Sequence, residues 1–466
     1  MEIEDVILRL IGQELGRIGV QFMEVRYERT TGTGITIVDG VTREVGRSIN
    51  AGIGVRAFSD GAWGFSATTV LKEPAIKDTI ESAAKIAKRA SKATKEKFEL
   101  KEVSATEGES RVPVKVDPRD VSVQDKVRFV MDLDRQATAF SPKVVNVNCF
   151  MGETLGQITI INSFGTHVKK EVSRVRAGAS VYVAEDGVRE RSFEGVGGTG
   201  GYEILQSEEA SMLGEAAAKR AVKLLDAKPA PSGKFTVVMD PRLVGVFIHE
   251  AFGHACEADK VIAGASIIEG RIGDKMGSES ITVVDDPSIR GLYGSFSNDD
   301  EGIPAHPRVL VERGVMKGYL HSVETASRLN AEPNGAARAQ DFMSTPIVRM
   351  SNTYIAKGDC KVDEVFEGVK YGIYALGSEY GYVIPASGQF TFKCDYAHII
   401  KDGEPRGLIR DAALSGLILE ALNNVEVVGN DLSFEPGVCG KAGQSVPVTT
   451  GGPHVRVANV VVGGVK

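Results

Sequence analysis

The sequence has few cysteines and no long apolar run. Its five cysteines, at positions 149, 256, 360, 394 and 439, form neither a CxxC pair nor a dense cluster. We therefore expect no disulfide framework, and we expect a reducing, cytoplasmic location. No apolar stretch approaches the about 18 residues of a membrane-spanning helix, and the acidic start MEIED is unlike a signal peptide. We therefore expect no membrane partner.

An excess of positive charge is also lacking. The net charge of −7 provides no broad basic surface, so we expect no nucleic-acid partner. With 466 residues, of which 42% are hydrophobic, the chain is long enough for more than one domain and a large core. Glycine is plentiful, with 53 residues, which indicates many tight turns and hairpins.

The N-terminal half contains one pattern twice. Apolar residues at helical spacing predict a helix over 3–19, strands follow to about residue 69, and Pro74 opens a second helix. After a charged linker or crossing segment at 92–118, Ser122 caps a new helix and the order recurs. Strands then run from about 144 to 191, and Ser207 caps a long helix that ends at Asp226.

Short identities support a duplicated unit. EVGR at 44–47 precedes an Ala-Gly pair, and EVSR at 171–174 precedes another. The Pro- and Gly-rich segment 227–234 predicts a boundary. We expect an α+β fold with two domains. Residues 1–228 form the N-terminal domain of duplicated helix–strands–helix units, and 233–466 form a mainly β domain that carries a metal-binding helix.

Within the C-terminal half, hairpins are expected over 309–320 and 390–408, a helix over about 411–424, and a last strand over 455–462.

The residues with metal-binding and proton-transfer chemistry are concentrated in HEAFGHACEAD, residues 249–259. Two imidazoles and an adjacent carboxylate are what a zinc hydrolase needs, because the nitrogens bind the ion and the carboxylate serves as a base. The buried strand 235–239 precedes this motif.

Asp240 offers an N-cap oxygen and Pro241 fits the first helical position, so a helix should hold the motif against the core. His249 and His254 are five residues apart, which places them about 140° apart on a regular α-helix. They can meet at one ion only if the helix widens into a π-turn or unwinds near Gly253. The alternative is two unrelated core histidines.

A catalytic zinc usually takes three protein ligands. Glu257, close in sequence, and Cys439, on a glycine-flanked loop, are both candidates for the third position, and residue chemistry alone leaves the choice open.

Two other segments resemble binding motifs only weakly. GVGGTG at 195–200 is expected to be a flexible turn rather than a nucleotide site, and the acidic run Asp299-Asp300-Glu301 is expected to be a solvated loop rather than a cation site.

The 249–259 motif together with PGVCGKAGQSVPV at 436–448 resembles the TldD branch of the TldD/PmbA family of zinc metalloproteases. The stretches GVRAFSDGAWGFSA, NDDEGIPA and GVMKGYLHSVETASRL agree, so the resemblance runs nearly from end to end. It implies that His249, His254 and Cys439 bind zinc and that Glu250 is the general base. The companion TldE/PmbA branch lacks the histidine motif, so this chain is expected to be the catalytic member.

The resemblance further implies small or unfolded peptides as substrates. It also implies a closed chamber formed by a homodimer or by a heterodimer with a TldE/PmbA-type subunit. The rival hypothesis is a non-enzymatic regulatory scaffold with a structural zinc. Four Cys or His ligands normally close a structural site, whereas only three strong ligands are visible here, beside a base. A hydrolase of non-peptide amides is a third alternative.

Overall fold

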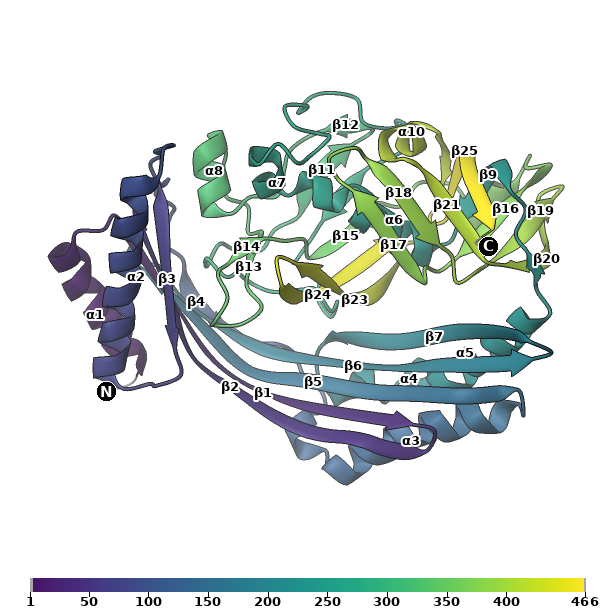
Figure 1. Ribbon diagram of the computed structural model, residues 1–466, viewed down its shortest axis with the longest axis horizontal. Coiled ribbons are helices and arrows are strands. Elements are labelled where there is room, and N and C mark those ends of the chain that lie inside the picture. The colour runs from purple at the N-terminus through teal and green to yellow at the C-terminus, as the bar shows by residue number, and fades with distance from the viewer. Residues whose placement is uncertain (1–2, 465–466) are drawn as a thin grey trace.

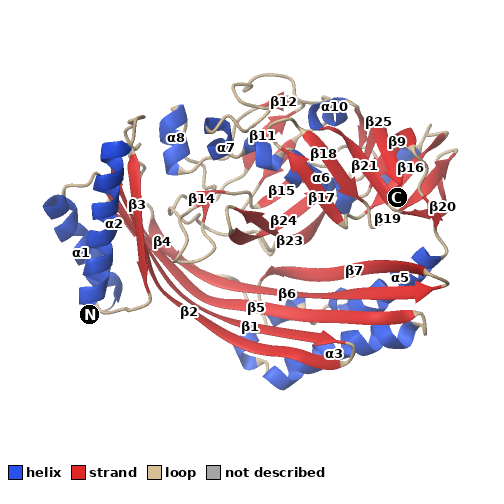
Figure 2. Ribbon diagram, viewed as in Figure 1, coloured by secondary structure: helices blue, strands red, loops and turns tan. Residues whose placement is uncertain are grey.

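The computed structural model describes residues 3–464. A long, curved sheet made by the N-terminal half runs beneath the C-terminal half, which lies against the concave face of the sheet (Figure 1). Helices cover the opposite face near both ends of the sheet (Figure 2). The α+β class is confirmed. No helix of residues 3–464 is both long and apolar enough to cross a membrane.

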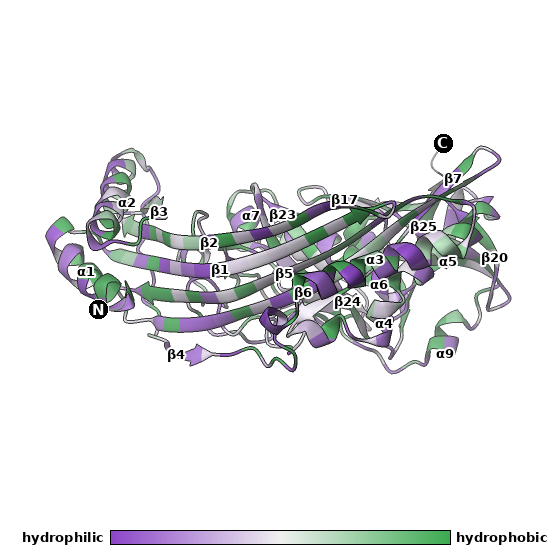
Figure 3. Ribbon diagram, turned by 90° about the horizontal axis from the view of Figure 1, so that it is seen from below, coloured by the Kyte–Doolittle hydropathy of each residue, from purple (hydrophilic) through white to green (hydrophobic). Residues whose placement is uncertain are grey.

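The first sheet has seven strands in the order β3-β2-β1-β5-β6-β4, with β7 also paired to β6. Hydrophobic and hydrophilic residues alternate along its long strands (Figure 3), because successive side chains point to opposite faces. Its strands are β1 Phe22–Val38, β2 Val41–Ser59, β3 Ala62–Thr68, β4 Glu107–Ser110, β5 Val144–Asn162, β6 His167–Glu185 and β7 Val188–Thr199.

The helices of this half bury one apolar face each against the sheet. Ile7 and Leu10 of one helix and Ile76 and Ile80 of the next form a core with β1 and β2, while the later helices form a second core with β5 and β6. These helices are α1 Ile3–Ile18, α2 Glu73–Ala93, α3 Val123–Phe140, α4 Glu208–Ser211 and α5 Leu213–Leu225, with 3₁₀ turns at Pro118–Asp120 and Tyr202–Ile204.

The predicted duplication is visible in the strand order. Each unit contributes three consecutive strands, β3-β2-β1 and β5-β6-β7, and the two units join through antiparallel pairing of β1 with β5. EVGR lies in β2 and EVSR in β6, the second strand of each unit. The predicted Ser122 cap is confirmed, since its Oγ accepts a hydrogen bond from Asp125 N at 3.1 Å.

Two predictions in this half are wrong. The helix after Ser207 is not continuous, because Met212 donates to Glu209 O across a tighter turn and separates α4 from α5. The GVGGTG segment is not a flexible turn, because β7 extends through it to Thr199 and pairs with β6. Its glycines instead permit close approach of the 291 loop, to which Thr199 N donates a hydrogen bond of 3.1 Å.

The C-terminal half contains a ten-stranded and a six-stranded sheet, with α6 packed between them. The ten-stranded sheet comprises β8 Lys228–Pro229, β9 Gly233–Met239, β16 Tyr371–Leu376, β17 Tyr380–Ile384, β18 Gln389–Lys393, β19 Tyr396–Lys401, β20 Glu404–Arg410, β21 Ala412–Leu417, β22 Val425–Val428 and β25 Val455–Gly464. The six-stranded sheet comprises β10 Val283–Asp285, β11 Arg308–Glu312, β12 Val315–Met316, β15 Asn352–Ile355, β23 Ser433–Lys441 and β24 Gln444–Gly452.

The remaining elements of this half are short. They are the pair β13 Ala337–Arg338 and β14 Ile347–Val348, the helices α6 Pro241–Ala251, α7 Ala258–Ile262, α8 Val323–Leu329, α9 Val362–Phe366 and α10 Ile418–Asn423, and a 3₁₀ turn at Gly253–Cys256. The two hairpins are present and turn at Arg313 and Asp402, both in the left-handed region, as predicted. Their bounds differ from the prediction: they span 308–316 and 396–410, and 389–393 is the separate strand β18, which pairs with β17 and β21. The division into two domains at 228 and 233 stays a prediction.

The helix expected over 411–424 is mostly wrong. Residues 412–417 form strand β21, which pairs with β18 and β25, and only Ile418–Asn423 is helical. Asp411 has a φ of 56°, which cannot begin an α-helix, and burial then alternates from Ala412 to Ser415 as in a strand. Short apolar runs do not distinguish the two structures without knowledge of their neighbours.

Candidate metal centre

Helix α6 fixes the first histidine in the core. Its start matches the prediction: Asp240 Oδ1 accepts a hydrogen bond of 2.8 Å from Leu243 N, and Pro241 occupies the first turn. Phe247 and Ile248 are buried between the two C-terminal sheets. His249 is therefore held on a rigid element, with only 2% of its surface exposed.

Helix α6 ends two residues after His249. The α-helix stops at Ala251, Phe252 is the C-cap, and a 3₁₀ turn continues through His254. This break, rather than a π-turn, brings the imidazole rings of His249 and His254 to a centroid separation of 5.3 Å. Gly253 is required for packing, because a Cβ built there would overlap Sδ of Met350.

Cys439 reaches the same point from the far end of the chain. It lies in β23, opposite Val446 of β24, and α6 packs against both strands. Its Sγ is 3.6 Å from Nε2 of His254. One ligand atom from each of His249, His254 and Cys439 lies within 4.8 Å of the others, and all three residues are buried. The structure thus brings together the three residues that the resemblance implies as ligands.

Glu257 occupies a different place from the one a third ligand would need. Its Oε2 is 3.0 Å from Nδ1 of His254, the ring nitrogen opposite the one near Cys439. The same carboxylate lies 3.1 Å from the ammonium groups of Lys260 and Lys441. It therefore fits the role of orienting the His254 ring, so that Nε2 faces the cluster.

The residues fit a divalent zinc ion by their chemistry. Two imidazoles and a thiolate form a common zinc donor set. The Nδ1 atom of His249 is buried and has no hydrogen-bond partner among residues 3–464, which is unusual for a polar atom unless a ligand satisfies it. The cluster's burial would keep such an ion away from bulk water.

The charges within the cluster favour an ionised thiol. Burial alone would raise the pKa of Cys439, but the positive charge and hydrogen bonds of the two histidines outweigh it and lower this pKa to about 4. Burial likewise opposes protonation of His254, yet the Glu257 carboxylate and the thiolate raise its pKa to about 10. Complete burial would raise the pKa of Glu257, but His254, Lys441 and Lys260 outweigh it and hold this pKa below its usual value.

Glu250 lies between this cluster and a cavity. Its Oε2 is 3.7 Å from Nε2 of His254, and 34% of its side chain is exposed. The cavity, about 840 Å³ in volume, is lined by Glu250, His249, Arg242 and Glu435 from the C-terminal half and by residues of β7 from the first sheet. A carboxylate at this position can reach both the cluster and a molecule in the cavity.

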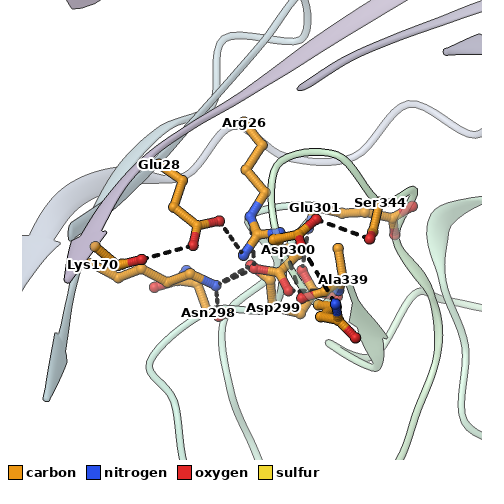
Figure 4. A network of polar contacts seen from close by, with 12 residues as sticks. Arg26, Glu28, Lys170, Asn298, Asp299, Asp300, Glu301, Ala339 and Ser344 are labelled. Atoms are coloured by element: carbon orange, nitrogen blue, oxygen red, sulfur yellow. Dashed lines mark hydrogen bonds and ion pairs between the residues drawn. The ribbon is translucent and has the colours of Figure 1, made fainter. Parts of the chain in front are cut away.

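The acidic run 299–301 is not a solvated loop, and that expectation is wrong. All three carboxylates are buried, and together with Lys170 and Arg26 they join the C-terminal half to the first sheet (Figure 4). Lys170 Nζ lies 2.7 Å from Asp300 Oδ1, and Arg56 Nη2 lies 2.8 Å from Glu301 Oε1. Glu24, Arg26 and Glu28 alternate along β1, which puts the polar groups on its concave face.

Sequence reasoning missed three supporting residues. Glu257 was considered only as a ligand, although its i+3 spacing from His254 already places the two side chains near one another. Lys441 follows Cys439 at the strand's period of two and binds Asp259 at 2.7 Å. Met350 gave no signal, because its contact with the turn at Gly253 comes from a distant segment.

A buried cluster of two imidazoles and a thiol, with a carboxylate at the edge of a cavity, defines a candidate metal-dependent hydrolase site. Three family models match successive parts of the chain: PmbA/TldA metallopeptidase domain 1 at 23–87, the central domain at 116–225 and the C-terminal domain at 232–464. The chain belongs to the PmbA/TldD metallopeptidase family.

Relatives at full length carry related names. A metalloprotease of Methanothermobacter thermautotrophicus is 38% identical over 96% of both chains. A metalloprotease TldD homolog of Buchnera aphidicola is 31% identical, covering 92% of this chain and 90% of its own. A zinc metalloprotease TldD homolog of Saccharolobus solfataricus is 27% identical, covering 96% and 97%.

Solved structures show the same fold. The crystal structure of TldE from Thermococcus kodakarensis matches with a TM-score of 0.79 at 18% identity, over 98% of this chain and 100% of that one. A Thermotoga maritima protein described as a candidate modulator of a DNA gyrase matches with a TM-score of 0.80 at 21% identity, over 99% and 100%. At these identities the likeness concerns the fold alone.

Proposed function

We propose that this protein is a zinc-dependent peptidase that hydrolyses small or unfolded peptides. The observation that carries the proposal is the juxtaposition of the buried His249, His254 and Cys439 cluster with Glu250 at the edge of the cavity. A structural zinc site closed by four ligands does not require a partly exposed carboxylate such as Glu250 beside it. The names of the full-length relatives point to the same class of enzyme.

In this proposal His249, His254 and Cys439 hold zinc. When bound, zinc would lower the pKa of a coordinated water and polarise the scissile carbonyl. Glu250 accepts the proton from the attacking water and delivers it to the leaving amine, a role that its exposure to the cavity and proximity to the cluster allow. Glu257 keeps the His254 ring oriented during these steps.

The cavity sets the size of the substrate. It lies between β7 and the C-terminal half, and its volume of about 840 Å³ suits a short peptide segment rather than a folded domain. Small or unfolded peptides meet this requirement. We further propose that the protein works in the cytoplasm as a homodimer or with a TldE/PmbA-type subunit, since a TldE shares its fold.

The proposal is tested by zinc content and cleavage of an unstructured peptide, measured on the same preparations. The wild type should hold about one zinc per chain, as three ligands for a single ion predict, and should cleave the peptide. Glu250→Gln should retain zinc and lose cleavage, while Cys439→Ala should lose both. Glu312→Gln, which alters an exposed carboxylate, and Cys360→Ala, which alters a thiol outside the cluster, are matched controls.

The outcomes also separate the alternatives. Zinc retained in Cys439→Ala would remove Cys439 from the ligand set, and cleavage retained in Glu250→Gln would remove Glu250 as the base. Zinc binding without cleavage of any peptide, alone or with a TldE/PmbA-type subunit, would favour the regulatory scaffold. Cleavage of small amides but not peptides would indicate a different hydrolase.

A further inference from the structure

A second cavity, about 930 Å³ in volume, lies between the first sheet and the C-terminal half. Val446 and Pro447 of β24 form part of its wall, whereas the cavity at Glu250 is bordered by other residues of the β23–β24 pair. Its remaining walls include Arg174 of β6 and Arg338 of β13. The proposed mechanism uses neither residue.

These two guanidinium groups contact only neutral groups. Arg174 donates from Nε to Tyr293 O at 3.1 Å and from Nη2 to Ser295 O at 3.0 Å. Arg338 donates from Nη1 to Met350 O at 2.8 Å, and its guanidinium lies 5.2 Å from the ring centroid of Phe296. No carboxylate within residues 3–464 forms an ion pair with either side chain, although Arg338 is only 5% exposed.

The neighbouring cations differ in this respect. Lys170 and Arg26 line the same cavity, but Asp300 lies 2.7 Å from Lys170 Nζ, and Glu28 lies 3.3 Å from Arg26 Nη2 (Figure 4). Glu28 and Asp300 are therefore paired with other cations, whereas Glu171 and Asp299, which also line the cavity, accept hydrogen bonds from backbone N–H groups. Within residues 3–464, Arg174 and Arg338 have no carboxylate at ion-pair distance, although Asp300 attracts both from farther away and Asp285 also attracts Arg338.

A buried cation without an ion-pair partner is costly, and arginine does not readily lose its proton. This cost falls mainly on Arg338, because Arg174 is only partly buried. Burial, followed by the charge of Arg174, lowers the pKa of Arg338 to about 9, and burial lowers that of Arg174. An oxyanion in the cavity would remove this electrostatic penalty. Guanidinium groups suit such a ligand, because their planar N–H groups match the two oxygens of a carboxylate or phosphate.

We propose that the cavity lined by Arg174 and Arg338 is a binding site for an oxyanion, a carboxylate or phosphate group. One source is the C-terminal carboxylate of a peptide, and this source rests on the proposed peptidase function. The other is a free phosphate, which is independent of that function. The charge of the site accepts both, so the experiment distinguishes them.

Binding of inorganic phosphate to the full chain, with zinc removed by a chelator, is measured by isothermal titration calorimetry. Arg338→Gln and Arg174→Gln should each weaken binding by about tenfold or more, since each removes a charged hydrogen-bond donor that faces the anion. Arg189→Gln, which removes an exposed arginine from the other cavity, should leave binding unchanged. Because the readout is binding without hydrolysis, failure of the peptidase proposal would not affect it.

Two peptides of one sequence, with a free or an amidated C-terminus, identify the source. Competition with phosphate by the free acid alone would assign the site to a peptide carboxylate, whereas competition by neither would assign it to phosphate. If neither phosphate nor the free-acid peptide binds the wild type, the proposal is overturned. Equal binding by the wild type and both folded arginine variants, with folding checked by circular dichroism, would also overturn it.

Discussion

Oε2 of Glu257 lies 3.0 Å from Nδ1 of His254. His254 belongs to the short 3₁₀ turn Gly253–Cys256, and Glu257 directly follows this turn. This contact fixes which ring nitrogen faces Cys439, because Nε2 of the same imidazole lies 3.6 Å from Sγ. Glu257 is completely buried and is also contacted by Lys441, the residue two positions after Cys439. The carboxylate therefore links the histidine turn to the cysteine strand.

Replacing Glu257 with Gln should weaken zinc binding without abolishing it. Loss of the carboxylate beside a ligating imidazole reduces metal affinity by about 10–100-fold. Competition against a chromophoric chelator measures the affinity. Asp259→Asn is the matched control, since Asp259 also binds Lys441 but does not contact His254. Complete loss of zinc in folded Glu257→Gln would instead indicate that Glu257 is itself a ligand.

In the metal-free protein, the Cys439–His254 pair should make a pH-dependent contribution to the free energy of unfolding. The pKa of Cys439 is about 4 in the folded protein against a usual 9.0. Between pH 4 and 9 the unfolded chain therefore binds the extra proton, and the contribution of Cys439 to the free energy of unfolding grows as pH rises. The folded pKa of His254 is about 10 against a usual 6.5, so its contribution is lost as pH rises from 6.5 to 10. Between 6.5 and 9 the folded and unfolded pair bind equal numbers of protons.

We therefore expect the pair to contribute rising stability from pH 4 to 6.5, a plateau to pH 9, and falling stability from 9 to 10. The measurement is the melting temperature of chelator-treated protein as a function of pH, with the profile of the Cys439→Ala, His254→Ala double variant subtracted to remove the other groups. A difference profile that rises steadily through pH 6.5–9 would show that His254 does not hold its proton.

Gly253→Ala should destabilise the protein by about 1–3 kcal/mol, because the new methyl group would overlap Sδ of the buried Met350. Urea unfolding measures the change. The double variant Gly253→Ala with Met350→Ala should destabilise less than the sum of the single variants, since truncation of Met350 removes the overlap and the new methyl group partly fills the space left behind. Gly12→Ala, at an exposed position of α1 without a nearby atom, should stabilise by about 0.8–1.0 kcal/mol.

Asp300→Asn should reduce the free energy of unfolding by about 3–5 kcal/mol, because it leaves Lys170 buried without its partner. Chemical denaturation measures the loss. Glu404→Gln removes an exposed pair with Arg406 and should cost at most about 1 kcal/mol. An equally small effect of Asp300→Asn would mean that Lys170 is neutral or finds another acceptor in the folded protein.

The sequence by itself determined the local structure around the site. The helix after Asp240 and Pro241 could be predicted because capping and proline geometry act over a few neighbouring residues. The helix–strands–helix order of the duplicated unit was also readable, since burial follows the periods of helix and strand. The five-residue spacing of the histidines required a distortion of some kind.

Only the tertiary structure decided which distortion occurs and what it assembles. The break at Phe252 is shaped by Met350 packing against Gly253, and Cys439 meets His254 across 185 positions of the chain. The sequence of 299–301 predicted a solvated loop because its cationic partners, Lys170, Arg56 and Arg26, come from distant strands. Whether a charged side chain is buried depends on the cations that surround it in space, and local sequence does not contain them.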